Sequence, residues 1–122
     1  DITLIATGEM VYTAKKAAEV LEKEGIHARV LDMFTVKPLD EEAIIRAAKE
    51  TGAILTLEEH SIYGGLGASV AQVTAEHCPV PMKTLGFPSE VLLGGTSKEI
   101  QTHYGLSPEN AVAESKALLK KK

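Results

Sequence analysis

Short apolar runs alternate with longer amphipathic segments along the whole chain. The apolar runs cover residues 2–6, 28–33, 53–57 and 82–87, and they predict four buried strands. Apolar residues at helical spacing predict helices over residues 10–24, 41–50 and 65–77, a short helix through 104, and a last helix from 107 to the closing lysines.

Strands that alternate with helices predict crossover connections and a parallel sheet. We therefore expect an α/β fold with one domain over residues 1–122: a three-layer α/β/α sandwich with a mainly parallel sheet in the strand order 2-1-3-4. The strands are apolar almost throughout, as strands are when helices cover both faces of a sheet. The fourth strand is expected to be the weakest, because Gly86 interrupts it.

Three helix starts carry capping signals. Asp40 and Ser107 are expected N-caps, and Pro108 takes the first helical position after Ser107. The segment 96–99, Thr-Ser-Lys-Glu, has the spacing of a capping box. These signals fix where the second, fourth and fifth helices should begin.

One edge of the predicted sheet collects polar residues. In the order 2-1-3-4 the topological switch point of the sheet lies between the first and third strands. The segments 7–9 and 59–65 then lie next to each other at the carboxyl ends of these strands. Ligands and partners of open parallel α/β sheets gather at that edge.

The glycine turn at Gly64, Gly65 and Gly67 allows two interpretations. Free N–H groups at the start of the following helix could hold an anion, with Gly65, Thr7 and Gly8 as the candidate anion-binding residues. The glycines could instead let the helix pack closely on the sheet and let the turn adopt positive φ. Acidic Glu9 disfavours a phosphate beside Thr7, since it already complements the helix dipole.

The turn does not match two nucleotide-binding motifs. A dinucleotide fingerprint would need glycine where the chain has Val70, and no Gly-Lys-Ser/Thr of a P-loop occurs.

Charged and aromatic residues precede these glycines. Glu58 and Glu59 should point to opposite faces if the strand continues through them. His60 is a candidate general acid or base, or a residue that fixes the loop or contacts another subunit. Tyr63 is a candidate interface aromatic or packs beneath the loop. No nucleophile accompanies these residues, so no complete catalytic set is visible.

The composition indicates which kinds of partner and which cellular compartment to expect. The net charge of −4 argues against nucleic acid and anionic membranes, and no apolar run approaches the roughly 18 residues of a membrane span. Cys78 is the single cysteine, so no internal disulfide can form, and a reducing, cytoplasmic setting is expected. Cys78 itself is expected to be a small buried apolar group. No histidine pair has metal-ligand spacing. The opening on Asp1, directly before a strand, suggests a domain cut from something longer.

Several short motifs, taken together in order, resemble the C-terminal domain of transketolase. They resemble most the separately encoded C-terminal section of split transketolases. The motifs are Ile-Thr-Leu-Ile-Ala-Thr-Gly-Glu-Met at 2–10, Val-Lys-Pro-Leu-Asp at 36–40, Thr-Gly-Ala at 51–53, Glu-Glu-His at 58–60 and Gly-Gly-Leu-Gly at 64–67. The resemblance extends through Tyr104, Gly105 and the last helix.

The resemblance implies a cytoplasmic enzyme of the pentose phosphate pathway that uses thiamine diphosphate with Mg²⁺ or Ca²⁺. It moves a two-carbon ketol unit between sugar phosphates. The cofactor-binding Gly-Asp-Gly motif and the activating glutamate belong to other domains. No catalytic residue or metal ligand is therefore placed on this chain, and no cofactor is expected on this domain alone.

The resemblance also implies a supporting role in a homodimer. This domain would pack on the other transketolase domains, with the segment 59–67 toward those contacts. The expected interface or loop-fixing residues are Glu59, His60, Tyr63, Gly64, Gly65 and Gly67. The family's sheet also carries an antiparallel edge strand from just upstream.

Two other functions stay open. A similar domain occurs in 1-deoxyxylulose-5-phosphate synthase and in the β subunits of 2-oxo acid dehydrogenases. A stand-alone regulatory module that binds anions at the glycine turn is the third hypothesis.

Overall fold

The part of the chain that the structure describes contains nine helices and strands. The computed structural model describes residues 1–33, 39–61, 65–87 and 97–122. In chain order the elements are β1 (Ile2–Ala6), α1 (Met10–Lys23), β2 (Ala28–Asp32), α2 (Glu41–Thr51), β3 (Ile54–Ser61), α3 (Leu66–His77), β4 (Met82–Phe87), α4 (Ser97–His103) and α5 (Pro108–Leu119).

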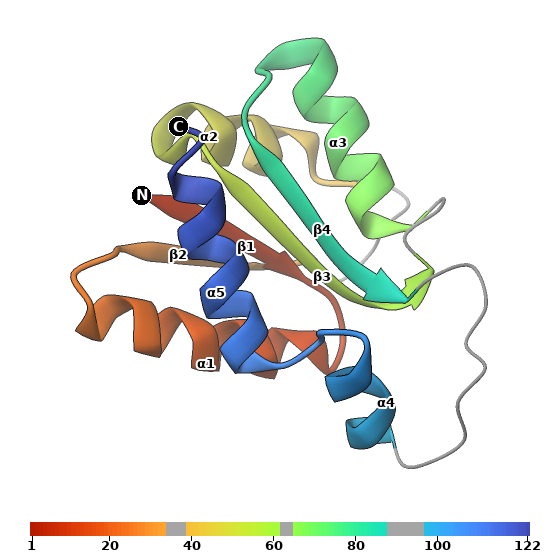
Figure 1. Cartoon of the computed structure of the whole chain (residues 1–122). Helices are drawn as coiled ribbons and strands as arrows, with labels where there is room; N and C mark the ends of the chain where they lie inside the picture. The colour runs from red at the N-terminus through yellow and green to blue at the C-terminus, as the bar shows by residue number, and fades with distance from the viewer. Residues whose placement is uncertain (34–38, 62–64, 88–96) are drawn as a thin grey trace.

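The four strands form one parallel sheet in the order β2-β1-β3-β4, which confirms the predicted fold. Helices lie on both faces of the sheet (Figure 1). Because each connection crosses over a face, all the carboxyl ends of the strands meet at one edge. None of the helices in the described residues is long and apolar enough to cross a membrane.

The alternation of side chains along the strands builds two cores. On one face, Leu4 of β1 and Leu55 and Leu57 of β3 pack with α1 and α5. On the other face, Ile5 of β1 and Ile54 of β3 pack with α2 and α3. The central strands β1 and β3 are therefore covered on both sides, as their continuous apolar runs predict.

Two of the expected helix caps are present. The Asp40 carboxylate accepts a hydrogen bond from the Ala43 N–H at 3.1 Å, and the Ser107 hydroxyl accepts one from the Asn110 N–H at 3.2 Å. Both predicted N-caps are thus confirmed. The predicted capping box includes Thr96, which lies outside the described residues, as does the segment 36–38.

Three details differ from the sequence-based expectation. β3 continues to Ser61 instead of ending at Leu57, because its pairing with β4 resumes there after an irregularity. β4 runs through Gly86 without interruption. Cys78 is half-buried rather than buried, since it follows the last turn of α3 and lies at the margin of the core.

Candidate functional site

The carboxyl end of β3 departs from regular pairing. Between Leu57 and Ser61 the strand advances four residues, whereas β4 advances two, from Leu85 to Phe87. The extra residues form a bulge over Glu58, Glu59 and His60. Bulges of this kind re-aim side chains and are frequent beside functional sites.

The two glutamates in the bulge have opposite environments. Glu58 is 2% exposed and lies on the face covered by α3, whereas Glu59 is exposed to solvent. The two neighbouring side chains therefore differ in burial, and the contacts of Glu58 place it toward α3. Of His60, the structure describes only the place of its backbone in β3.

Glu58 caps α3 from a distance. Its Oε1 accepts a hydrogen bond from the Leu66 N–H at 2.8 Å, and its Oε2 accepts one from the Gly67 N–H at 2.7 Å. The residue at the N-cap position, Gly65, has no side chain that could do this. The carboxylate therefore fills the place at the helix start where an external anion would bind.

Gly67 brings α3 into close contact with the sheet. A Cβ atom at this position would lie 2.3 Å from Thr84 Cγ2 and 2.8 Å from Thr56 Oγ1. Close packing is thus the reason that glycine stands at this position. The expectation of positive φ does not hold at Gly65, whose φ is −96°, or at Gly67, which is helical.

The turn after β1 is the second part of this edge. Gly8 is exposed with φ of +57°, and Thr7 beside it is half-buried. The following Glu9 carboxylate accepts a hydrogen bond of 3.4 Å from the Gln101 side chain of α4. The predicted neighbourhood of the β1 and β3 ends follows from their pairing, in which Ala6 lies opposite Leu57.

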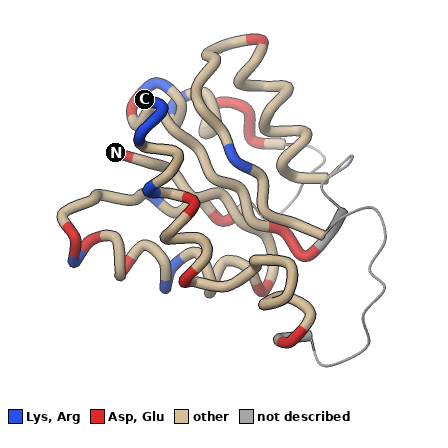
Figure 2. The backbone as a smooth tube through the Cα atoms, in the orientation of Figure 1, with Lys and Arg blue, Asp and Glu red and all other residues tan. Residues whose placement is uncertain are grey.

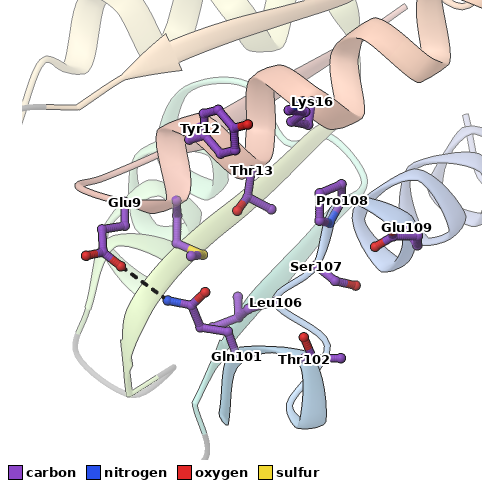
Figure 3. Close-up of a pocket in the computed structure, with 11 residues that line it drawn as sticks. Glu9, Tyr12, Thr13, Lys16, Gln101, Thr102, Leu106, Ser107, Pro108 and Glu109 are labelled. Atoms are coloured by element: carbon purple, nitrogen blue, oxygen red, sulfur yellow. Dashed lines mark hydrogen bonds between the residues drawn. The ribbon is translucent and has the colours of Figure 1, made fainter. Parts of the chain in front are cut away.

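A cleft of about 730 Å³ opens next to Glu9, between α1 and the α4–α5 region (Figure 3). It is lined by Glu9, Met10, Tyr12, Thr13, Lys16, Gln101, Thr102, Leu106, Ser107, Pro108 and Glu109. The Lys16 ammonium lies 5.3 Å from the centre of the exposed Tyr12 ring, and the Tyr12 hydroxyl raises the pKa of Lys16. Lys16 is the one basic residue among the described residues that line the cleft, and Glu9 and Glu109 are acidic, so the cleft is poorly suited to a phosphate.

Acidic residues lie at or just after the carboxyl ends of three strands: Glu9 follows β1, Asp32 ends β2, and Glu58 and Glu59 lie near the end of β3. Elsewhere acidic and basic residues are mixed along the chain, and lysines end it (Figure 2). In the described ranges no group of three or more histidine, cysteine or acidic residues could hold a metal ion.

The predicted site residues divide into three groups. Glu59 lies near the carboxyl end of β3, Gly65 takes the N-cap position of α3, and Thr7 and Gly8 follow β1, whereas Gly67 lies in the first turn of α3 against the sheet. Tyr63 and Gly64 lie outside the described residues.

The residue that the sequence-based site missed is Glu58. Two observations point to Glu58. The N-cap residue of α3 is a glycine, which has no side chain to accept a hydrogen bond from the helix start. Glu58 also lies two residues after Thr56, on the strand face that packs against α3.

The fold and this edge define a class: an open parallel α/β domain whose carboxyl edge carries polar residues. A comparison with known families narrows the class. The transketolase C-terminal domain family matches residues 1–111, and the chain belongs to this family.

Individual relatives agree with that assignment. One of the subunits of apulose-4-phosphate transketolase from Phocaeicola vulgatus is 50% identical over 99% of this chain, and the chain spans 38% of that protein's length. 1-Deoxy-D-xylulose-5-phosphate synthase of Heliobacterium modesticaldum is 40% identical over 97% of this chain and is matched over 18% of its own length.

Among solved structures, a split-gene transketolase described as an inactive β4 tetramer superposes with a TM-score of 0.93. It is 42% identical, and the match covers 98% of this chain and 39% of that one.

Proposed function

We propose that this chain is the C-terminal part of a thiamine-diphosphate-dependent transketolase, which moves a two-carbon ketol unit from a ketose phosphate to an aldose phosphate. The observation that carries the proposal is the 50% identity to a transketolase subunit over 99% of the chain. In this enzyme the domain supports the domains that hold the active site, and it is inactive alone.

The residues of this chain do not fit thiamine diphosphate or its Mg²⁺ or Ca²⁺ ion. The sequence contains no Gly-Asp-Gly segment, and its described residues offer no metal-binding cluster. The start of α3, where a phosphate could bind, is filled by the Glu58 carboxylate. We therefore propose that the other domains hold the cofactor and its metal ion.

The partners of the domain are proposed to be the remaining transketolase domains and the second copy in a cytoplasmic homodimer. The segment 59–67 would face these partners. The exposure of Glu59 near the end of β3 supports this placement. The net charge of −4 argues against nucleic acid or an anionic membrane as partner.

Reconstitution tests the proposal. The thiamine-binding section and the section that contains this chain are purified separately and assayed alone and mixed, with a ketose phosphate donor and an aldose phosphate acceptor. Ketol transfer is expected only in the mixture and only with added thiamine diphosphate. Transfer by the section that contains this chain, without its partner, would contradict the supporting role.

A second candidate is 1-deoxyxylulose-5-phosphate synthase, favoured by the 40% identity over 97% of the chain. This reaction joins a 2-oxo acid to an aldose phosphate and releases carbon dioxide, which ketol transfer does not. Measuring carbon dioxide release from labelled pyruvate in the same mixture separates the two activities. Release without ketol transfer would select the synthase.

A further inference from the structure

The start of α3 has the properties of an anion-binding site with an occupant already in place. The N–H groups of Leu66 and Gly67 lack acceptors within the helix, and both point at the carboxylate of Glu58. The aligned peptide dipoles of the 12-residue helix add partial positive charge there. A bound formate or phosphate would need the same N–H groups.

Within the described part of the chain, the counterpart of the Glu58 carboxylate is the start of α3 and not a basic side chain. Among the described residues, no lysine, arginine or histidine forms an ion pair with Glu58, and its side chain is 2% exposed. An ionised carboxylate only accepts hydrogen bonds, and here each oxygen accepts one. A buried charge persists when it is compensated, so the helix start and the carboxylate stabilise each other.

The position of Glu58 on β3 makes the contact a clamp between two elements. Glu58 lies in the bulge at the end of the strand, eight residues before Leu66, and its bonds join the end of β3 to the first turn of α3. The close approach of Gly67 to Thr56 and Thr84 holds the same turn against the sheet. The exposed Glu59 is carried on the same bulge.

We infer that Glu58 is a positioning residue that acts as a built-in anion. It closes the α3 N-terminus to external anions, phosphate groups of sugars among them, and ties the polar end of β3 to α3. Many parallel α/β domains bind a phosphate at the start of a helix. In this domain the start of α3 binds the carboxylate of Glu58 instead. The N–H groups of Leu66 and Gly67 are then unavailable to an anion site that would include Thr7, Gly8 and Gly65.

Chemical rescue tests the inference in the complete enzyme that contains this chain. The Glu58→Ala variant removes the carboxylate and leaves the two N–H groups facing a small cavity. Its midpoint of thermal unfolding is expected to fall by several degrees. Sodium formate should raise that midpoint more than sodium chloride at the same ionic strength, and more than formate raises the wild-type midpoint.

Glu59→Ala is the matched control, because Glu59 is the neighbouring, exposed glutamate. It should show neither the fall in the midpoint nor a response specific to formate. Equal effects of formate and chloride on Glu58→Ala would overturn the inference, as would equal effects of formate on the variant and the wild type.

A second variant covers the case in which Glu58→Ala does not fold. Glu58→Gln keeps the size of the side chain but turns an NH₂ group toward one of the two N–H groups. Hydrogen exchange of a peptide that contains Leu66 and Gly67 should become about tenfold faster than in the wild type. Unchanged exchange would contradict the clamp. None of these measurements depends on ketol transfer, so their failure is distinct from failure of the proposed transketolase role.

Discussion

Helices α3 and α5 begin in different ways on opposite faces of the same sheet. In α5 the cap is local, since the Ser107 hydroxyl accepts from the Asn110 N–H three residues on. In α3 the N-cap is a glycine, and Glu58 reaches the first turn from the preceding strand. A local cap stabilises one helix end, whereas the remote cap also fixes the helix to the sheet.

The largest expected effect comes from forcing α3 away from the sheet. Gly67→Val places a branched side chain where a Cβ alone would lie 2.3 Å from Thr84 Cγ2. Overpacking of this kind costs roughly 1–3 kcal/mol and occasionally more, and we expect about 3 kcal/mol of the free energy of unfolding to be lost. Denaturant unfolding measures this value.

A second substitution checks the cause. Combining Gly67→Ala with Thr84→Ala removes the nearest obstructing atoms and should lose less stability than the sum of the two single changes. Simple additivity of the two effects would show that close packing is not the reason for the glycine. Ala68→Val, at the exposed neighbouring position, serves as the control for helix propensity.

The local caps are expected to contribute less. Asp40→Ala and Ser107→Ala each remove one capping hydrogen bond, and each should cost about 1 kcal/mol. The two caps lie on helices of opposite faces, so the double variant should lose the sum of both. Chemical denaturation of the three variants measures the loss in the free energy of unfolding. If either single variant lost as much as Glu58→Ala, local and remote caps would not differ in their contribution to stability.

The smallest effect concerns two buried threonines. Thr56 Oγ1 has no hydrogen-bond partner among the described residues, whereas Thr3 Oγ1 lies 2.8 Å from Thr51 Oγ1. Thr56→Val should therefore leave stability unchanged or raise it slightly, while Thr3→Val should lower it by about 1 kcal/mol. A clear loss in Thr56→Val, measured by thermal unfolding, would reveal a hydrogen bond of the Thr56 hydroxyl that the structure does not contain.

The fold was predictable because its signals are local. The apolar runs identified the four strands, their alternation with helices predicted the parallel sheet, and the caps at Asp40 and Ser107 involve residues three positions apart. The pairing of β1 with β3 followed from the predicted strand order.

The chemistry of the carboxyl edge was less predictable because it depends on distance in space. The bulge after Leu57 adds residues whose pairing depends on β4, and the bond from Glu58 to Leu66 requires the placement of a whole helix. Periodicity predicted that Glu58 and Glu59 diverge, but it could not say which of them is buried. That choice follows from which face α3 covers.

The hydrogen bond between Lys122 and Asp1 brings the residue before β1 next to the residues that follow α5. Lys122 Nζ donates to the Asp1 carbonyl oxygen at 2.7 Å, and both ends lie at the edge opposite the bulge (Figure 1). Residues that adjoin Asp1 or Lys122 in a longer protein would therefore leave this domain from the same side, away from the bulge at the end of β3.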